Sequence, residues 1–451
     1  MINPRHSPKT LVLGLGKTGL SCARYLQGQG VTVAVMDSRQ SPPELARACR
    51  ELPDLALFLG GFDPEVIRTA ERLVVSPGIS LREPPIAAAK ARGMPVVGDV
   101  ELFAQAVCAP VAAVTGSNGK STVTTLLGQM ARLDGVRVAV GGNLGPPALD
   151  LLDDGVELYV LELSSFQLES TRSLTPEAAT VLNVSADHMD RYDDLADYAA
   201  AKARILSGAR TGVLNLDDSR VRAMAGIADR GIGFFLRPPE TASDFGLLEH
   251  SGEPWLGRGG DRLLPAGEVA AKGRHNLANA LAALAMGQAC GLSEAAMLGA
   301  LRTFRGLPHR TTLVANKGDL DWYDDSKGTN PGATMAALNG LIDPADPRRV
   351  ILIAGGDCKG ADFAALALAV EQAARAVVLI GRDAPMIERA LDGRARILHA
   401  KDMREATRRA LEAAWPGDCV LLSPACASFD MFENYAHRGR EFAAAVETLE
   451  V

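Results

Sequence analysis

The chain has 451 residues, which at about 150 residues per domain is enough for three domains. Hydrophobic residues make up 47% of it and charged residues 22%, a balance that supplies several cores and excludes a disordered chain. The net charge of −7 argues against non-specific binding to nucleic acid.

The seven cysteines include no CxxC pair, which argues against a disulfide framework or a zinc site and favours a reducing compartment. The N-terminus lacks the apolar core of a signal peptide, and no apolar run of about 18 residues occurs, so we expect a cytoplasmic protein without membrane insertion.

Short apolar runs alternate with helical stretches along the chain, a pattern typical of βαβ units and parallel sheets. The first section predicts strands at Thr10–Leu13, Val31–Val35, Leu55–Leu59, Leu73–Val75 and Pro95–Val97. The second section predicts strands at Val111–Val114, Val136–Val140, Leu158–Leu163, Ala179–Val184 and Gly212–Asn215, then an antiparallel piece within 234–269 and a helix at Asn276–Met286. The third section predicts strands at Val350–Ala354, Ala376–Ile380 and Cys419–Leu422. We therefore expect an α/β protein divided into residues 1–108, 109–306 and 307–451.

The sharpest motif is VAAVTGSNGKST at 111–122, where an apolar strand runs into a Gly-rich turn and then a helix. Glycines let successive backbone N–H groups point into one concavity, and the helix N-terminus adds positive potential there. Lys120 can reach the β- and γ-phosphates of a nucleotide, and Ser121 or Thr122 can hold Mg²⁺. The usual pattern has Gly at the first position, where this chain has Val114, so we interpret the motif as a variant P-loop.

A second Gly-rich turn, LVLGLGKTG at 11–19, follows the first predicted strand, and Asp37 ends the next one. This is the position of the ribose-binding acid in dinucleotide-binding folds. The motif alone is weak, and it also fits a tight βα turn that binds nothing. A nicotinamide-dependent oxidoreductase therefore stays open as an alternative.

Polar residues follow two further strands of the second section. Glu162 ends one strand, where a carboxylate near Lys120 is a natural Mg²⁺ ligand, and His188 comes shortly after the next. Lys202 lies in an Ala-rich helical segment, where a lysine is ordinarily solvated, so the residues alone give it no special role. Asn276 and Asn279 share one face of a helix. Their amides can equally well bind the adenine or a phosphate of a nucleotide, or cap the start of the helix. Arg310 lies at the second boundary, from which it can reach a nucleotide bound by the neighbouring domain.

Three loops of the third section combine Gly or Pro with polar groups directly after predicted strands. They occupy 323–331, 354–363 and 422–430. Any one of them is a generic active-site loop, but three in one section indicate a polar small-molecule site, with lysines for a carboxylate or phosphate.

Taken together these motifs resemble the Mur ligase family, ATP-dependent amide-forming enzymes of peptidoglycan synthesis. The resemblance spans nearly the whole chain and rests on TGSNGKST at 115–122, ELSSFQ at 162–167, NVSADHMDRY at 183–192, HNLAN at 275–279, DDSKGTN at 324–330 and GGDCKGADF at 355–363. The segments GLGKTGLS at 14–21 and SPACASFD at 423–430 are similar to the branch that adds D-glutamate to UDP-N-acetylmuramoyl-L-alanine. The resemblance implies a Rossmann-like N-terminal domain for the UDP-sugar, a central P-loop-type parallel sheet for ATP and a Rossmann-like C-terminal domain for the amino acid.

The resemblance also implies a role for individual residues. The UDP-sugar is expected to contact Thr18, Asp37, Ser38, Arg39, Gly78, Asn143, Ser164 and Gln167. ATP is expected at Gly116, Ser117, Asn118, Gly119, Lys120, Ser121, Thr122, Asn279, Arg310, Asp325 and Lys327. Two Mg²⁺ ions are expected at Ser121, Glu162, His188 and a carbamylated Lys202, and Lys120, Glu162, His188 and Lys202 form the expected catalytic set. D-Glutamate is expected at Thr329, Lys359, Ser428 and Tyr435, in an enzyme that we expect to be a monomer.

The implied reaction proceeds through an acyl phosphate: the alanyl carboxylate attacks the γ-phosphate, and the amine of D-glutamate then displaces phosphate. A nicotinamide-dependent oxidoreductase leaves Lys120 and the third-section loops unexplained. A GTPase-type nucleotide switch is a further alternative. A folylpolyglutamate-type ligase is the nearest alternative, since it shares this fold and chemistry.

Overall fold

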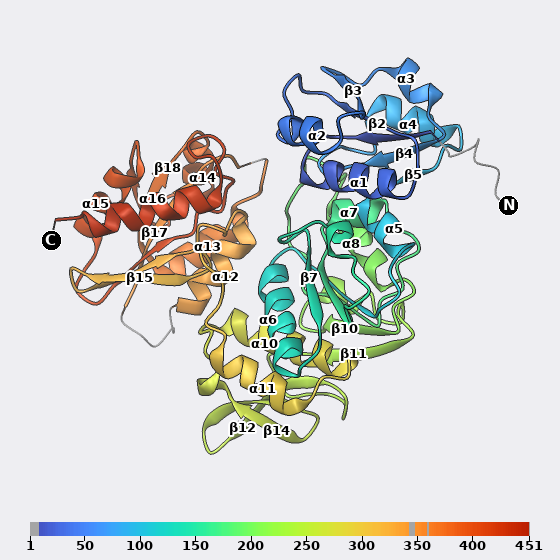
Figure 1. Ribbon diagram of the computed structural model, residues 1–451. Coiled ribbons are helices and arrows are strands. Elements are labelled where there is room, and N and C mark those ends of the chain that lie inside the picture. Colours follow the sequence, from blue (N-terminus) through green and yellow to red (C-terminus); the bar gives the residue numbers. More distant parts are fainter. Residues whose placement is uncertain (1–8, 342–347, 359, 451) are drawn as a thin grey trace.

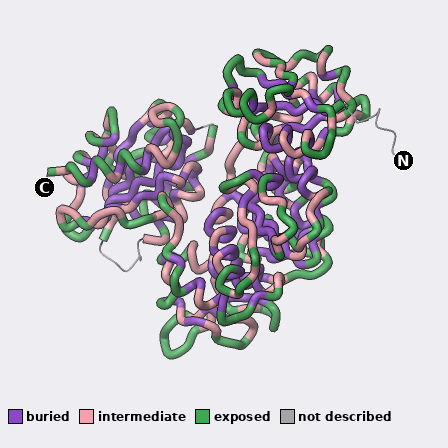
Figure 2. Tube along the Cα trace, viewed as in Figure 1, coloured by how far each residue is buried: buried purple, intermediate pink, exposed green. Residues whose placement is uncertain are grey.

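Three β-sheets, each covered by helices, form three lobes joined in chain order in the computed structural model (Figure 1). The structure describes residues 9–341, 348–358 and 360–450. Buried residues follow the strands through the middle of each lobe, and exposed residues lie on the outer helices and loops (Figure 2). Within these described residues, no helix is both long and apolar enough to cross a bilayer.

The N-terminal sheet has five parallel strands in the order β3-β2-β1-β4-β5. Its strands are β1 (Thr10–Leu13), β2 (Val33–Asp37), β3 (Ala56–Leu59), β4 (Arg72–Val75) and β5 (Val96–Val97). Its helices are α1 (Lys17–Gly28), α2 (Leu45–Glu51), α3 (Pro64–Thr69), α4 (Pro84–Ala91) and α5 (Asp99–Ala104). The strand order reverses beside β1, so the Gly-rich turn after β1 lies where open α/β sheets bind ligands.

The central sheet has nine strands in the order β14-β13-β12-β11-β10-β9-β6-β8-β7. Its parallel part comprises β6 (Val111–Thr115), β7 (Val138–Gly142), β8 (Leu158–Glu162), β9 (Ala178–Val181), β10 (Thr211–Asn215) and β11 (Arg230–Phe234). The antiparallel edge comprises β12 (Phe245–His250), β13 (Glu253–Arg258) and β14 (Asp261–Pro265), which confirms the piece expected within 234–269. Its helices are α6 (Lys120–Leu133), η1 (Ala148–Leu151), α7 (Ser165–Glu169), α8 (Leu195–Ala203), η2 (Arg204–Leu206), α9 (Ser219–Arg222), η3 (Ala266–Glu268), α10 (Arg274–Ala289) and α11 (Glu294–Thr303).

The C-terminal sheet has six strands in the order β15-β16-β20-β17-β18-β19. They are β15 (Thr312–Lys317), β16 (Leu320–Asp324), β17 (Val350–Gly355), β18 (Ala374–Ile380), β19 (Arg396–His399) and β20 (Cys419–Leu422), and only the β15–β16 pair is antiparallel. Its helices are α12 (Pro331–Leu341), α13 (Ala364–Ala373), α14 (Ala384–Leu391), α15 (Met403–Ala413) and α16 (Tyr435–Glu447).

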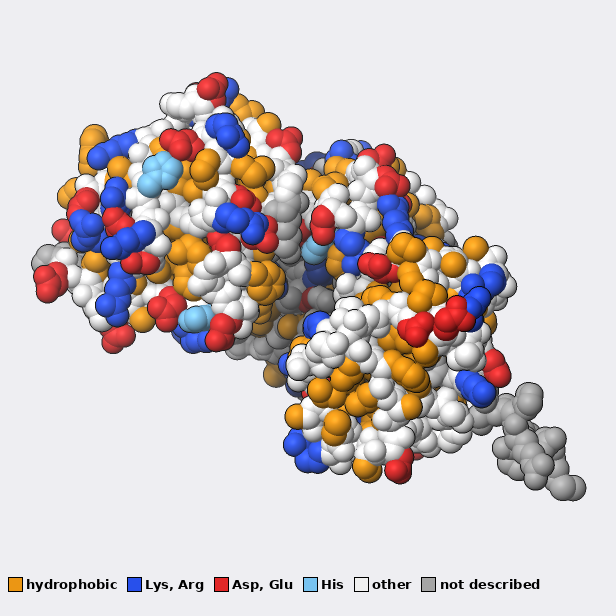
Figure 3. All heavy atoms as spheres, turned by 90° about the horizontal axis from the view of Figure 1, so that it is seen from above, with side chains coloured by type: hydrophobic (Ala, Val, Ile, Leu, Met, Phe, Trp, Pro, Cys, Tyr) orange, Lys and Arg blue, Asp and Glu red, His pale blue; other side chains and the backbone are white. Residues whose placement is uncertain are grey.

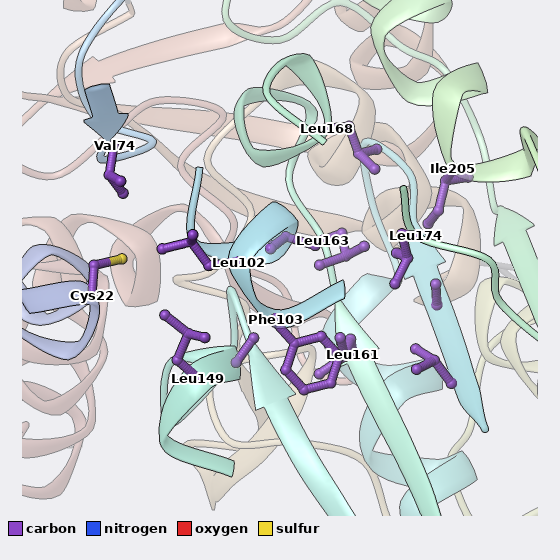
Figure 4. Close-up of a cluster of buried hydrophobic side chains, with 14 of the residues drawn as sticks. Cys22, Val74, Leu102, Phe103, Leu149, Leu161, Leu163, Leu168, Leu174 and Ile205 are labelled. Carbon is purple, nitrogen blue, oxygen red and sulfur yellow. The ribbon is translucent and has the colours of Figure 1, made fainter. Parts of the chain in front are cut away.

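The first two lobes share one hydrophobic core. Cys22 and Val74 of the N-terminal lobe lie in the same buried cluster as Leu149 and Leu161 of the central lobe. Phe103 on α5 lies in this cluster, next to Leu149 and Leu161 (Figure 4). The Phe103 ring also meets Tyr159 of β8 edge-on, with ring centroids 5.2 Å apart. Burial of this kind stabilises by about 25 cal/mol per Å² of apolar surface, so the shared core holds the two lobes together. The C-terminal lobe has separate clusters, and the surface is hollowed between it and the N-terminal lobe (Figure 3).

The predicted α/β class is confirmed, and every strand predicted from the sequence overlaps a strand of the structure. The sequence predicts no strand at the positions of β11, β15, β16 and β19. β15 and β19 are edge strands whose residues are exposed or half-buried, and the first residues of β11 are exposed, so these three strands lack a continuous buried apolar run. Strand β16 is largely buried, but the charged residues Asp321 and Asp324 interrupt its apolar pattern.

Candidate nucleotide and amide-ligation site

Loops that follow neighbouring strands of the central sheet converge at one edge. The Gly-rich turn follows β6, Glu162 ends β8 and the segment 183–188 follows β9, and these three strands are adjacent. Parallel strands place their carboxyl ends together, so the residues after them meet although they are far apart in sequence.

The turn between β6 and α6 has the backbone of a phosphate-binding loop. Gly116 and Gly119 have φ angles of +153° and +84°. A Cβ at Gly119 would lie 2.5 Å from the Asn279 side-chain oxygen. Side chains from the β9 loop then fix the turn: Asn183 accepts from the N–H of Asn118 at 2.8 Å and donates to its carbonyl at 3.0 Å. The turn is therefore preorganised around glycines, as an anion-binding concavity requires.

Lys120 and Lys202 both point at this turn. The Nζ of Lys120 donates to the carbonyls of Gly116 and Ser117 at 2.8 and 2.9 Å. The Nζ of Lys202 donates to the same Gly116 carbonyl at 2.9 Å and lies 4.4 Å from the centre of the Tyr198 ring. Lys202 is only 1% exposed, so the expectation of an ordinary solvated lysine is wrong. Lys202 lies near the C-terminal end of α8, and its side chain points inward to Gly116.

Burial and the neighbouring charge of Lys120 hold the pKa of Lys202 well below its usual range, against the opposing effects of Asp187 and Glu162. Burial also lowers the pKa of Lys120. A neutral amine is the form of lysine that reacts as a nucleophile, and desolvation of this kind is how proteins produce it.

Glu162 brings a buried carboxylate to the same edge. Its Oε1 accepts from the Asn143 side chain at 2.7 Å, whereas its Oε2 is buried with no hydrogen-bond partner. A buried carboxylate oxygen without a donor is costly unless a cation binds it. The residue therefore fits a Mg²⁺ ligand, and hard cations favour such oxygens.

His188 lies beyond β9 with a positive φ of 57°, its Nε2 3.6 Å from the Asp187 carboxylate. Its ring packs edge-on to Phe166 at 4.8 Å. Asn330 of the C-terminal lobe donates to Asp187 at 3.3 Å and to Asn118 at 3.2 Å, so this segment is also a contact between lobes.

Among the residues the structure describes, no three His, Cys, Asp or Glu side chains form a cluster that could hold a metal ion by themselves. A cation here would therefore need further ligands beyond Glu162 and His188, such as phosphate, water or a modified Lys202.

A cavity of about 320 Å³ lies between the central and C-terminal lobes. It brings together seven of the residues expected to bind ATP: Asn118, Gly119, Thr122, Asn279, Arg310, Asp325 and Lys327. Apolar side chains of Leu182 and Phe234 line it as well. Its size and mixed lining suit a nucleoside.

The C-terminal lobe closes this cavity with charged groups. Arg310 donates to the Ser121 hydroxyl at 3.0 Å, which ties the segment before β15 to the phosphate loop. Asp325 accepts from Thr311 at 3.1 Å and from Ser423 at 2.7 Å, and burial nevertheless raises its pKa to about 7. Burial, with the charges of Arg310 and Lys120, lowers the pKa of Lys327 to about 8. The Nζ of Lys327 lies 4.1 Å from the centre of the Tyr435 ring.

Asn276 and Asn279 lie in the first turns of α10 and share a face, as the spacing predicts. Asn279 donates to the Asn276 side chain at 3.2 Å, and Asn276 donates to the Lys272 carbonyl at 2.7 Å. Asn276 thus contacts the chain before the helix, while Asn279 lies beside Gly119.

The N-terminal Gly-rich turn is held by Asp37. This carboxylate accepts from the N–H of Leu15 at 2.7 Å and from the Arg39 guanidinium at 2.7 and 2.8 Å. Although burial opposes it, these hydrogen bonds lower the pKa of Asp37 to about 2. Asp37 therefore orients Arg39, and Arg39, Ser38 and Gly78 lie exposed near the turn that carries the half-buried Thr18.

Three further residues expected to contact the UDP-sugar, Asn143, Ser164 and Gln167, follow β7 and β8. Asn143 is held by Glu162 through both its backbone and its side chain. Ser164 caps α7 and forms a reciprocal capping box with Gln167. Gln167 is buried and donates to Asp99 of α5 at 3.0 Å, so its amide supports the junction of the first two lobes.

The three C-terminal loops come together because β16, β20 and β17 are adjacent. Ala425 donates to the Gly328 carbonyl at 2.9 Å, and Asp357 and Ala427 exchange backbone hydrogen bonds at 3.0 and 2.9 Å. Thr329 is half-buried and Ser428 is 3% exposed, while Tyr435 begins α16. Lys359, the charged residue expected to bind D-glutamate, lies outside the described residues.

Sequence reasoning missed several side chains that shape the site. They include Asn183, Ser185, Tyr198 and Asp187 of the central lobe and Asn330 of the C-terminal lobe. Ser117, for example, accepts from the N–H of Ser185 at 3.0 Å and lies 3.4 Å from the Tyr198 hydroxyl. For Asn183, Ser185, Asp187 and Asn330 the available signal is their position in polar segments that follow strands, whereas Tyr198, inside α8, has no such signal.

Comparisons with known proteins agree with this arrangement. Three family descriptions match in order: "Mur ligase MurD-like, N-terminal domain" at residues 8–98, "Mur ligase middle domain" at 114–287 and "Mur ligase, glutamate ligase domain" at 309–426. The chain belongs to the Mur ligase family. Among its curated relatives, proteins of Nitrosococcus oceani, Methylobacillus flagellatus and Pseudomonas aeruginosa are 54%, 53% and 52% identical to it. The alignments cover 99%, 98% and 97% of this chain and 98%, 97% and 98% of the relatives, each of which is named UDP-N-acetylmuramoylalanine–D-glutamate ligase.

Solved structures show the same fold at low sequence identity. The UDP-N-acetylmuramate-alanine ligase of Thermotoga maritima is 19% identical with a TM-score of 0.59, over 98% of this chain and 99% of that one. The pseudomurein peptide ligase type C of Methanothermus fervidus is 18% identical with a TM-score of 0.58, over 92% and 96%.

Proposed function

We propose that this chain is an ATP-dependent ligase that joins D-glutamate to UDP-N-acetylmuramoyl-L-alanine and releases ADP and phosphate in peptidoglycan precursor synthesis. The observation that carries the proposal is the 51–54% identity, over nearly the full length, to relatives that all bear the name of this activity. The site geometry supports it, because a preorganised phosphate loop faces a second lobe across a nucleoside-sized cavity. The oxidoreductase alternative leaves that arrangement unexplained, and neither it nor a nucleotide switch accounts for the high identity to relatives that bear this ligase name.

We assign the three substrates to the three lobes, with residues 1–108 holding the UDP-sugar, 109–306 ATP and 307–451 D-glutamate. Arg39 and Thr18, at the Gly-rich turn, support the first assignment, and the lining of the central cavity supports the second. The third rests on the convergence of Thr329 and Ser428 with the loop that carries Lys359. We propose a cytoplasmic monomer, since all three assigned lobes lie on one chain and ATP is a cytoplasmic nucleotide.

The proposed chemistry begins with attack of the alanyl carboxylate on the γ-phosphate. Lys120 reorients from the Gly116 and Ser117 carbonyls to the phosphate, where its charge offsets the charge that develops in transfer. Mg²⁺, held by Ser121, Glu162 and His188, supplies Lewis-acid stabilisation when bound. The D-glutamate amine then attacks the acyl phosphate, and phosphate leaves the tetrahedral intermediate. The lobes must exclude water during this step, since water would hydrolyse the acyl phosphate.

We further propose that Lys202 is carbamylated by CO₂. The neutral amine attacks CO₂ and loses a proton, which gives a carbamate whose oxygens can face the cation near Glu162. The burial of Lys202 and its contact with Gly116 support this assignment, because they favour the uncharged amine and place it beside the phosphate loop.

Phosphate release tests the function directly. Purified protein should release phosphate from ATP only when UDP-N-acetylmuramoyl-L-alanine and D-glutamate are both present. With oxygen-18 in the alanyl carboxylate, the released phosphate should carry the label, because that oxygen is transferred in the acyl-phosphate route. Phosphate release that does not depend on the UDP-sugar would contradict the proposal.

A further inference from the structure

Two buried cysteines meet between the C-terminal loops. The Sγ atoms of Cys358 and Cys426 are 2.8 Å apart, and the two residues are 3% and 0% exposed. Cys358 follows β17 and Cys426 follows β20. The two residues are 68 positions apart in sequence, and the packing of the two loops brings them together. The Asp357–Ala427 backbone bridge holds the two loops in this register.

Of the two cysteines, Cys358 also lines a cavity beside other groups of the site. A cavity of about 20 Å³ is lined by Cys358 together with Asp187, His188, Thr329 and Asn330. A space of this size holds about one water molecule. This space lies against Cys358, which is therefore the residue of the pair placed to meet a small oxidant, whereas Cys426 is 0% exposed.

We propose that Cys358 and Cys426 form a peroxide-driven, reversible disulfide that regulates the amino-acid side of the site. The sulfur of Cys358 attacks one oxygen of hydrogen peroxide, the O–O bond breaks, and the departing hydroxide takes up the thiol proton as water. The Cys426 sulfur then attacks the resulting sulfenic sulfur, the S–O bond breaks, and a second water leaves. Two thiols lose two electrons in total, and one peroxide is reduced to two waters. A dithiol reductant reverses the cross-link by thiol–disulfide exchange.

The surroundings of Cys426 suit the resolving role. Its sulfur lies 2.8 Å from that of Cys358, so it is already in place to attack a sulfenic acid formed there, and its thiol gives up its proton in that step. Arg438 donates to the Cys426 carbonyl at 3.1 and 3.2 Å and is itself 1% exposed, which fixes this loop in place.

The consequence for catalysis rests on the proposed function. The disulfide fixes the loop after β17 to the loop that carries Ser428, and both flank the site assigned to D-glutamate. Loops that are cross-linked cannot adjust around the incoming amino acid. We therefore expect oxidation to raise the KM for D-glutamate several-fold and to leave the KM for ATP unchanged.

Peptide mapping tests the site independently of any activity. Full-length protein is treated with hydrogen peroxide, alkylated, digested and analysed by mass spectrometry for a peptide pair joined through Cys358 and Cys426. We expect the pair in wild type and in a Cys290→Ser control, its loss on dithiothreitol treatment, and its absence in Cys358→Ser and in Cys426→Ser. The inference is overturned if the exposed Cys49 and Cys108 become oxidised while Cys358 and Cys426 are both alkylated as free thiols.

Kinetics on the same samples test the regulatory part. The ratio of the KM for D-glutamate in oxidised and reduced protein is compared within each variant, so any direct effect of a substitution cancels. The ratio should rise in wild type and in Cys290→Ser and stay at one in Cys358→Ser. A mapped disulfide with an unchanged ratio in wild type would overturn the regulatory role. A protein that forms the disulfide but never uses D-glutamate would contradict the proposed function alone.

Discussion

Lys120 and Lys202 donate to the same carbonyl oxygen, that of Gly116, at 2.8 and 2.9 Å. Two ammonium groups on one oxygen repel each other, and burial adds to the cost of charging both. The arrangement is relieved if one lysine loses its charge, and Lys202, which is 1% exposed, is the more buried of the pair. Carbamylation of Lys202 would turn this repulsion into attraction, and Lys120 would then be free to meet a phosphate.

The first prediction concerns Lys202. Lys202→Ala should be nearly inactive, and a small added carboxylate such as formate should restore part of the activity by replacing the missing anionic ligand. Lys202→Arg should stay inactive, because it keeps a positive charge where a negative one is needed. Phosphate release across a formate titration measures both effects. Lys120→Ala is the matched control and should not respond to formate; full activity in Lys202→Arg would remove the carbamate assignment.

The second prediction concerns Lys120. Lys120→Ala should lower turnover by about two orders of magnitude or more, because a cation positioned at a transferring phosphoryl group stabilises charge that develops late. The thermal midpoint should change little, since Nζ makes hydrogen bonds only to carbonyls of its own loop. The exposed Lys401→Ala serves as the control for both readouts. Turnover close to that of wild type would mean that this loop does not hold the reacting phosphate.

The third prediction concerns Glu162. Glu162→Gln can keep the contact with Asn143, but it replaces the unpaired Oε2 with an amide N–H group that repels a cation. The Mg²⁺ concentration for half-maximal activity should therefore rise at least several-fold. A Mg²⁺ titration of phosphate release, with exposed Glu249→Gln alongside, measures the shift. An unchanged Mg²⁺ requirement would show that Glu162 is not a ligand.

The fourth prediction concerns pH. The pKa of Asp325 is raised to about 7 in the folded protein, from 3.8 in an unfolded chain, because burial disfavours the charged form. The folded state then binds more protons than the unfolded state between these values, so the free energy of unfolding falls as pH rises towards 7 and levels off above it. The slope from this one group is at most about 1.4 kcal/mol per pH unit.

Asp325→Asn removes that slope. Relative to wild type, its thermal midpoint should therefore rise between pH 5 and pH 8, whatever the constant effect of losing a carboxylate. Differential scanning calorimetry at several pH values gives the comparison, with exposed Asp154→Asn expected to follow wild type. Parallel pH profiles for Asp325→Asn and wild type would contradict the raised pKa.

Local sequence signals could predict the phosphate loop, because strand, glycines, Lys120 and helix follow one another within a dozen residues. They could also predict that residues after adjacent parallel strands converge, which points to Glu162 and His188. They could not predict the burial of Lys202, since its local helix gives no sign of what packs against it. Nor could they predict that the Asp37 carboxylate accepts hydrogen bonds from Arg39. The contact between Cys358 and Cys426 could not be predicted either, because it depends on how two separate loops pack.

The central claim is that this chain couples ATP cleavage to the addition of D-glutamate. The most direct measurement is the incorporation of a radiolabelled amino acid into UDP-N-acetylmuramoyl-L-alanine, compared for D-glutamate, L-glutamate, D-glutamine, L-alanine and a diamino acid. We propose that the site pairs both carboxylates of its substrate, with Lys359 as the charged residue and Thr329 and Ser428 as donors, because an unpaired buried charge costs several kcal/mol. D-Glutamate alone should be incorporated, and Lys359→Ala should raise its KM strongly while changing that for ATP and the UDP-sugar only a few-fold. Incorporation of L-alanine or the diamino acid, or a Lys359→Ala defect confined to ATP, would contradict the account.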